Sequence, residues 1–175
     1  MSNCRLTLKW IIAALCVCGM NASYAATATN TFTVSSTVVA SCSSPTTETL
    51  AFGNYNPISG SAATATANIT ITCTNTTAIT SVTLNAGTGT GTINARKMEK
   101  NGTDTTKTLN YNLYTSVANT SIWGDGTTGN VSNNVSGSAG IGSAQTITVY
   151  GTIASGQTTV EPGSYSDTIT VTINY

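Results

Sequence analysis

Apolar and polar residues alternate along several short segments of this chain, with glycine-rich stretches between them. Period-two alternation is typical of β-strands that bury one face, because successive side chains point to opposite sides of the strand. No segment carries helical periodicity over three turns. Such strands predict an all-β sandwich or barrel, with Asn110 and Asn112 on its outer face. The alternating segments are 67–73, 82–84, 109–113, 147–153 and 169–175.

A further alternating segment, residues 31–42, lies near the N-terminus, ahead of the other strands. Phe32, Val34 and Val38 share one parity within it. Another alternating strand ends at Tyr175, the last residue of the sequence. A sandwich that begins with a free strand and finishes on an edge strand can complete a neighbour's sheet instead of its own. The pattern therefore favours the subunit of a polymer.

The first 25 residues have the features of a secretory signal peptide. Arg5 and Lys9 precede or flank the start of an apolar run of about ten residues, and small residues at positions 23 and 25 predict cleavage after Ala25. The run is shorter than the roughly 20 residues that a transmembrane helix needs. The mature chain is therefore expected to be exported and not inserted in a membrane.

Charged side chains are scarce after this leader. Residues 26–175 contain four Lys or Arg and six Asp or Glu, which gives a net charge of −2. Nucleic-acid binding needs a basic surface, so this class of function is excluded. The chain contains no His, and two thiolates do not complete a tetrahedral metal shell. We therefore expect neither a metal nor another cofactor.

Two cysteines remain after removal of the leader, Cys42 and Cys73. In an exported domain, two cysteines most simply form one disulfide. Both lie at core-facing parity, so a bond between two core-facing strands fits the pattern. In the chain-entropy model, closing a loop of about 30 residues stabilises the folded state by roughly 3–4 kcal/mol.

No group of residues stands out as a catalytic site. The absence of His excludes a Ser-His-Asp triad, and no Ser-x-x-Lys motif occurs. Glu99 and Asp104 could in principle act as paired carboxylates, but the charged segment 96–104 is expected to be a solvated hairpin loop. We therefore do not expect an enzyme. Four aromatic residues are expected in the core and at its rim rather than on a sugar-stacking platform: Tyr111, Tyr114, Trp123 and Tyr150.

Six short motifs, together covering nearly the whole mature chain, occur in an order that resembles one known family. They are Leu-Ala-Phe-Gly-Asn-Tyr-Asn-Pro (50–57), Arg-Lys-Met (96–98), Leu-Asn-Tyr-Asn-Leu-Tyr (109–114), Trp-Gly (123–124), Val-Tyr-Gly-Thr-Ile (149–153) and a final run that begins Pro-Gly-Ser-Tyr-Ser-Asp (162–175). The sequence resembles the spore coat U domain family, which includes the major pilins of archaic chaperone–usher pili.

The resemblance implies an incomplete immunoglobulin-like β-sandwich of the pilin type, which lacks its final strand. Residues 26–36 would form an N-terminal donor strand, and residues 37–175 the pilin domain. A periplasmic chaperone would fill the open groove first. At an outer-membrane usher, the donor strand of the next identical subunit would replace the chaperone, and a tip or minor subunit would complete the fibre. The product would be the major subunit of a cell-surface pilus that supports attachment and biofilm formation.

Alternation assigns residues to the two sides of this exchange. Burial of the Phe32 and Val34 side chains should contribute roughly 1.5–3 kcal/mol each. The donor ends between residues 35 and 38. Donor residues of one parity are Ala28, Asn30, Phe32, Val34 and Ser36, and the acceptor groove and chaperone contact should comprise Ile169, Val171, Ile173 and Tyr175.

Two other functions are compatible with the same residues. One is a tip adhesin module, although adhesins of the family carry an additional receptor-binding domain. The other is a secreted monomeric coat protein whose own N-terminal strand fills its groove.

Overall fold

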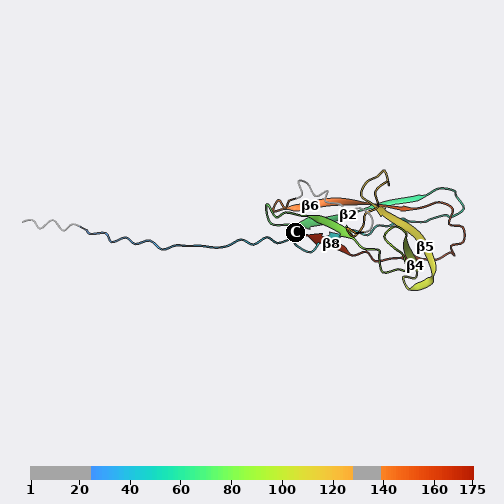
Figure 1. The fold of residues 1–175 in the computed structure, drawn as a ribbon, viewed down its shortest axis with the longest axis horizontal. Coiled ribbons are helices and arrows are strands. Elements are labelled where there is room, and N and C mark those ends of the chain that lie inside the picture. Colours follow the sequence, from blue (N-terminus) through green and yellow to red (C-terminus); the bar gives the residue numbers. More distant parts are fainter. Residues whose placement is uncertain (1–24, 128–138) are drawn as a thin grey trace, which may run out of the picture. The chain divides into compact units, whose positions relative to one another are not determined.

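The computed structural model describes residues 25–127 and 139–175, and every regular element within them is a β-strand (Figure 1). The predicted all-β class is confirmed. The chain divides into two units, residues 1–36 and 37–175, which we call the N-terminal unit and the β-domain. No helix in the described ranges is long and apolar enough to cross a membrane. The predicted signal peptide, apart from Ala25, lies outside the described residues.

Eight strands lie in the described part of the β-domain. They are β1 (Thr46–Thr47), β2 (Ala63–Thr72), β3 (Ser81–Leu84), β4 (Arg96–Lys100), β5 (Asp104–Tyr114), β6 (Ala144–Ile153), β7 (Tyr165–Ser166) and β8 (Val171–Asn174).

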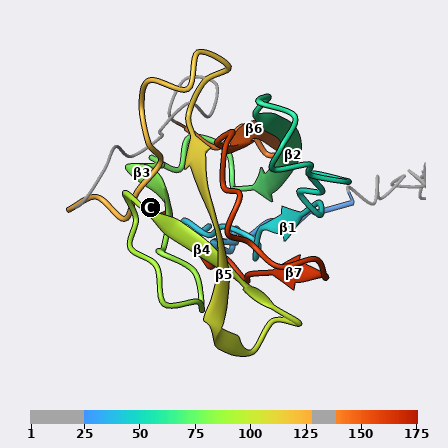
Figure 2. The same ribbon diagram turned by 90° about the vertical axis from the view of Figure 1, so that its right-hand side faces the viewer.

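Six of these strands form one antiparallel sheet in the order β1-β2-β6-β5-β4-β7, while β3 and β8 pair in a second sheet. The pair β2–β6 is the longest ladder, with Ala63 opposite Ile153 and Thr72 opposite Ala144. The larger sheet curls, so that its two edge strands β1 and β7 come to the same side of the domain (Figure 2). The core lies inside this curl.

The alternation predicted from the sequence fills that core. Ile69 and Ile71 of β2 are buried, and Ile147 and Val149 of β6 face the same interior. The residues between them are polar, mostly threonine, and are half-buried or exposed. Threonine suits this outer face because its branched side chain favours the extended backbone while its hydroxyl meets water.

The charged segment 96–104 differs from the solvated loop that the sequence predicts. Strand β4 occupies residues 96–100, and its side chains Met98 and Glu99 are buried. The turn is reduced to three residues before β5 begins. Asn101 and Gly102 have φ angles of 56° and 73° there, a conformation that asparagine and glycine tolerate best. The number of charges in this segment was misleading as a sign of exposure, because Arg96 and Glu99 are both buried.

Arg96 is wholly buried and connects β4 to the elements around it. Its Nε and Nη2 donate to the carbonyl of Asn85 at 3.0 and 2.7 Å, and Nη2 donates to the carbonyl of Trp123 at 2.8 Å. Nη1 donates to Asn112 Oδ1 at 2.9 Å and to the carbonyl of Ile93 at 3.1 Å. Burial lowers the pKa of Arg96 from its ordinary value, and neighbouring acidic groups oppose that shift. Oxygen dipoles, rather than a bonded carboxylate, satisfy this cation.

Two hydrogen-bond partners of Arg96, Asn112 and Trp123, are themselves buried. Asn112 is buried, contrary to the predicted outer position, because its side chain accepts from Arg96 and donates to the carbonyl of Asn94 at 2.9 Å. Trp123 is wholly buried, and its Nε1 donates to the carbonyl of Val82 at 2.8 Å. The expectation that Trp123 packs in the core is therefore confirmed.

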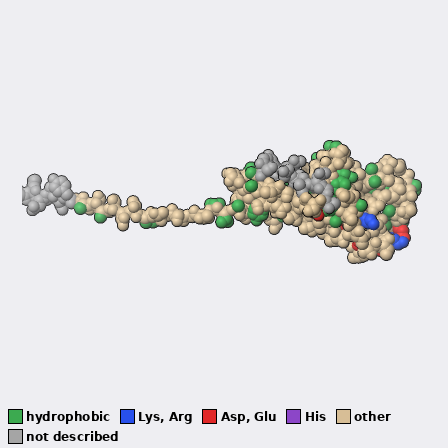
Figure 3. Space-filling model, in the orientation of Figure 1, with side chains coloured by type: hydrophobic (Ala, Val, Ile, Leu, Met, Phe, Trp, Pro, Cys, Tyr) green, Lys and Arg blue, Asp and Glu red, His purple; other side chains and the backbone are tan. Residues whose placement is uncertain are grey.

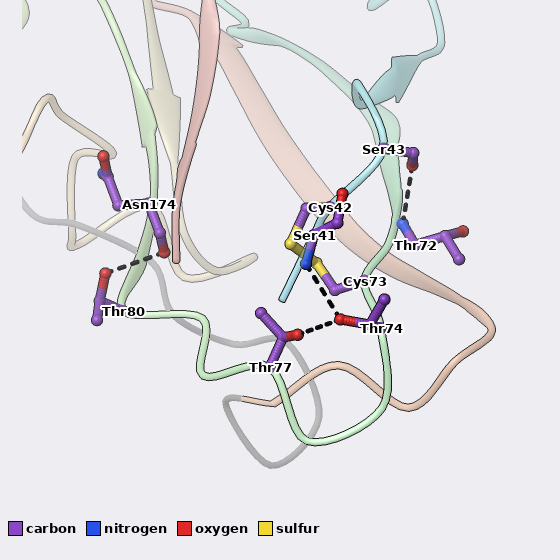
Figure 4. Close-up of a disulfide and its surroundings, with 9 residues drawn as sticks. All are labelled: Ser41, Cys42, Ser43, Thr72, Cys73, Thr74, Thr77, Thr80 and Asn174. Atoms are coloured by element: carbon purple, nitrogen blue, oxygen red, sulfur yellow. Dashed lines mark hydrogen bonds between the residues drawn. A yellow bond between two sulfur atoms is a disulfide. The ribbon is translucent and has the colours of Figure 1, made fainter. Parts of the chain in front are cut away.

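The predicted disulfide between Cys42 and Cys73 is confirmed (Figure 4). Backbone hydrogen bonds flank it on both sides: the N–H of Ser43 donates to the carbonyl of Thr72, and that of Thr74 to the carbonyl of Ser41, each at 2.8 Å. The bond thus joins the beginning of the β-domain to the residue that follows β2.

Replacing Arg96 should destabilise the domain strongly. Arg96→Met keeps much of the side-chain volume but leaves several buried carbonyls without a donor, and we expect a loss of about 3–5 kcal/mol in the free energy of unfolding. Lys97→Met, on the outward side of the same strand, is the control and should change stability by about 0.5 kcal/mol or less. Urea unfolding of the two variants measures the difference, and equal midpoints would contradict this role for Arg96.

Candidate functional site

A groove with a volume of about 1060 Å³ opens along the β-domain. One wall is the chain that follows β1 and contains Leu50 and Phe52, and the opposite wall runs from β7 towards β8 and contains Ile169 and Val171. Buried side chains of the larger sheet form its floor: Ile69, Met98, Leu109, Leu113, Val149 and Ile153. The groove therefore follows the line along which the two sheets come together.

Strand β8 has a partner on one edge, β3, and no strand of the described chain pairs with its other edge. The N–H of Asn85 donates to the carbonyl of Thr170 at 3.2 Å, so even-numbered residues of this segment direct their backbone groups to the β3 side. The odd-numbered residues Ile169, Val171 and Ile173 therefore direct their N–H and C=O groups to the open side. Their side chains pack against the core.

This arrangement combines two unmet requirements in one place. Apolar side chains line a groove that water must otherwise fill, and a row of backbone donors and acceptors lies along its side. An extended peptide with alternating apolar residues meets both at once, because its backbone bonds the edge while every second side chain enters the groove. The geometry of the groove and of the unpaired edge is therefore compatible with an added β-strand.

The groove wall that follows β1 packs against Gly151 of β6. A Cβ atom on Gly151 would lie 2.8 Å from Leu50 Cδ2 and 2.8 Å from Phe52 Cζ, so both side chains lie where a larger residue would project. Phe52 also meets Tyr111 edge-to-face, with ring centroids 6.2 Å apart. The absence of a side chain at position 151 thus determines how deep this wall sits.

Asp167 is a half-buried carboxylate in the opposite wall. Its Oδ1 accepts from the N–H groups of Thr88 and Gly89 at 2.8 and 3.2 Å, and its Oδ2 accepts from the hydroxyl of Tyr111 at 2.7 Å. A Cβ on Gly87 would lie 2.0 Å from Oδ2, so this loop needs glycine. These bonds hold the chain where it leaves β7, in one sheet, and enters β8, in the other.

Charged side chains also lie near one end of the groove. Glu161 pairs with Lys100 at 3.1 Å and with Lys107. These hydrogen bonds, that of Lys107 first, lower the pKa of the Glu161 carboxyl. On the face drawn in Figure 3, the visible charged side chains lie towards the part of the domain that holds β4 and β5. The pairs are exposed, so they contribute little to stability.

The structure places the predicted groove residues in different positions. Ile169 and Val171 line the groove, whereas Ile173 packs against the core beside it. Tyr175 is 57% exposed and does not line the groove. Its contact with a chaperone stays a prediction.

Sequence reasoning missed the wall opposite β8. Leu50 and Phe52 share a parity within the motif 50–57, and Gly151 lies in the motif 149–153. That the two motifs pack together could not be inferred from their separation along the chain. Asp167 was also missed, since it stands in an otherwise regular alternating strand.

The predicted donor residues lie in the N-terminal unit, where residues 25–36 are exposed and form no strand. Phe32 and Val34 are 87% and 82% exposed, an unusual state for two large apolar side chains two residues apart. The N–H of Thr31 donates to Asn30 Oδ1 at 2.8 Å. Ala28 and Ser36 are exposed as well. Their role as donors stays a prediction.

The candidate carboxylates form no shared site. Glu99 Oε1 accepts from the N–H of Thr90 at 3.1 Å, while Asp104 Oδ1 accepts from the N–H of Thr106 at 3.0 Å. Hydrogen bonds from Thr106 lower the pKa of Asp104. Within the part of the chain that the structure describes, no three His, Cys, Asp or Glu residues come together as a metal site.

Comparisons with known proteins point to one family. Residues 28–172 match the model of the Spore Coat Protein U domain. No curated protein matches the chain. A similar solved structure is the CsuC–CsuE chaperone–tip adhesion subunit pre-assembly complex from archaic chaperone–usher Csu pili of Acinetobacter baumannii, with 22% identity and a TM-score of 0.56. The match covers 79% of this chain and 40% of that one, and it supports the pilin-type fold.

Filling the space at Gly151 should weaken the groove as a strand-binding site. Gly151→Ala pushes Leu50 and Phe52 towards the groove, and overpacking of this kind costs about 1–3 kcal/mol. We expect a labelled peptide of residues 26–36 to bind about tenfold more weakly in fluorescence titration. Thr146→Ala, on the outer face of the same strand, is the control. Unchanged affinity of the peptide for Gly151→Ala would contradict the expectation that the added methyl group narrows the groove.

The domain should lose stability in alkaline solution through Tyr111. Burial, together with its bond to Asp167, raises the pKa of Tyr111 well above the ordinary 10.0. Because the pKa of Tyr111 is raised, the contribution of Tyr111 to the free energy of unfolding is complete below about pH 10. It is lost as the pH rises further, because the unfolded chain releases the proton more easily. The slope should reach about 1.4 kcal/mol per pH unit. Tyr111→Phe should lack this slope in urea unfolding, and equal slopes would count against the assignment.

Proposed function

This chain belongs to the Spore Coat Protein U domain family, and from that premise we propose that it is a subunit of a chaperone–usher pilus, polymerised by donor-strand complementation. One observation carries the proposal. The β-domain has a groove beside the open edge of β8, and the N-terminal unit of the same chain has an exposed segment with Phe32 and Val34 at alternate positions. The edge of β8 in the β-domain lacks a neighbouring strand, and the apolar side chains of the N-terminal unit lack a surface that buries them.

The exchange follows from ordinary strand chemistry. Residues 26–36 of one copy lie beside β8 of the next copy and bond the backbone groups of Ile169, Val171 and Ile173. The side chains of Phe32 and Val34 enter the groove, and their burial contributes roughly 1.5–3 kcal/mol each. Because the strand comes from another molecule, the association repeats from copy to copy and produces a fibre.

An open edge of this kind needs protection before assembly. An uncovered apolar groove next to unpaired backbone groups favours aggregation. We therefore assign a periplasmic chaperone as its first occupant and an outer-membrane usher as the place of exchange. The solved complex with a chaperone, the disulfide Cys42–Cys73 and the predicted signal peptide support transit through an oxidising compartment. The final location is a pilus on the cell surface.

Within the fibre, we assign this chain to the major subunit. A subunit that both offers a strand and accepts one can stand at every internal position, whereas a tip subunit needs to accept only. Surface attachment and biofilm formation would follow from the fibre as a whole. Proteins of this pilin type are structural pilus subunits and not enzymes.

A charge on the donor's inner face should abolish assembly. Phe32→Lys places an ammonium group in the apolar groove, where an unpaired charge is strongly unfavourable. We expect electron microscopy of cells that express the pilus system to show no fibres. Thr33→Lys adds the same charge at the opposite parity, where the side chain faces away from the groove, and should assemble normally. Normal fibres from Phe32→Lys would refute the donor assignment.

A further inference from the structure

Asp167 interrupts the apolar pattern of the groove wall. The odd-numbered residues from 165 to 173 are half-buried, and their even-numbered neighbours are exposed. Tyr165 and Asp167 at one end are followed by Ile169, Val171 and Ile173. The Oδ2 atom of Asp167 accepts from Tyr111, and a carboxylate oxygen has a second lone pair for another donor. The wall is therefore polar at one end and apolar at the other.

The two ends of the groove can be identified in the fold. The N–H of Thr80 donates to the carbonyl of Asn174 at 2.8 Å, and Figure 4 draws both residues at the end that holds the disulfide. At the other end, Phe52 meets Tyr111, whose hydroxyl reaches Asp167. The disulfide, near the start of the β-domain, thus lies towards the apolar end of the groove.

Chain length limits how a copy could fill its own groove. The six residue steps from Ser36 to Cys42 span at most about 20–22 Å when fully extended. The six steps from Asp167 to Ile173 already occupy about 20 Å of strand. A copy's own segment can therefore place Ser36 near Ile173 without difficulty, which makes that strand parallel to β8. Placing Ser36 at Asp167, in the antiparallel direction, would use the whole reach of those six steps, a limit that does not apply to a strand from a second copy.

Between Asp167 and Val171, the donor pattern matches the groove in one antiparallel register. With Val34 beside Ile169 and Phe32 beside Val171, the hydroxyl residue Ser36 falls beside Asp167. If the donor is shifted by two residues so that Phe32 lies beside Ile169, Val34 lies beside the carboxylate of Asp167. If it is shifted by two residues in the other direction, Ser36 lies beside Ile169 and the apolar Val38 lies beside the carboxylate. Each alternative buries an apolar side chain against a charge or leaves a hydroxyl without a partner.

We propose, on the basis of the proposed function, that Asp167 determines the register of the incoming strand. The occupant is residues 26–36 of a second copy, antiparallel to β8, with Ser36 at the carboxylate. A single polar position in an apolar contact selects among registers that would otherwise bury similar apolar area. Antiparallel insertion also continues the pairing direction of both sheets.

Paired cysteines report the register directly. Cα atoms of antiparallel partners lie about 4.5–5.5 Å apart, within disulfide reach. We expect polymers of Val34→Cys/Ile169→Cys and of Phe32→Cys/Val171→Cys to form ladders of cross-linked copies on non-reducing gels. The exchanged pairs, Val34→Cys/Val171→Cys and Phe32→Cys/Ile169→Cys, report parallel or shifted strands and should cross-link at least tenfold less. The matched single-cysteine variants control for random oxidation.

The cross-linking pattern separates a wrong register from a wrong function. Polymers that cross-link mainly through the exchanged pairs would overturn the register while leaving the proposed function intact. Cross-links confined to single chains would show that a copy fills its own groove, which contradicts both. Wild-type chains that form no polymer with chaperone and usher present would contradict the proposed function itself.

A second comparison isolates the role of the hydroxyl group. Ser36→Val and Ser36→Thr introduce side chains of the same shape, but only threonine keeps the donor for Asp167. We expect Ser36→Val to lower the cross-linking yield of the 34–169 pair about tenfold, since a buried carboxylate then faces a methyl group. Ser36→Thr should retain most of the yield. Equal yields from the two variants would remove Asp167 as the determinant of register.

Discussion

The open edge of β8 is the constraint on which the other features of this protein depend. On one side the strand bonds β3, and on the other its backbone groups face a groove lined by Ile169, Val171 and the side chains of Leu50 and Phe52. Water can satisfy the backbone groups but not the apolar walls. The domain is therefore a sandwich with one strand position vacant, and its proposed assembly route is a way to fill that position.

A domain with a vacant strand position needs other means to hold its two sheets together. Arg96 supplies part of this, because one guanidinium bonds carbonyls at Asn85 and Trp123 and the side chain of Asn112. The disulfide at Cys42 secures the beginning of the domain. Asp167 secures the passage from β7 to β8 through its bonds to the loop and to Tyr111. Directional bonds here complement apolar packing that the groove leaves incomplete.

Much of the fold follows from local patterns, and the exceptions share a cause. The alternation in 67–73 and 147–153 identifies β2 and β6, because each buries one face and exposes the other. The same rule fails at Asn112 and in the segment 96–104, where polarity suggested exposure. Arg96 and Asn112 can be buried because they bond each other and nearby backbone carbonyls, and such partnerships between separated residues are invisible in a window of a few positions.

The sequence by itself determined the strand class, the pairing of Cys42 with Cys73, and the alternating face that carries Phe32 and Val34. These depend on the period of the strand and on composition, which are local properties. Tertiary structure decided which edge stays open, that Leu50 and Phe52 form the second wall, and where Asp167 lies along it. Those features arise from contacts between segments far apart in the chain, and their geometry exists only once the sheets have curled around a common core.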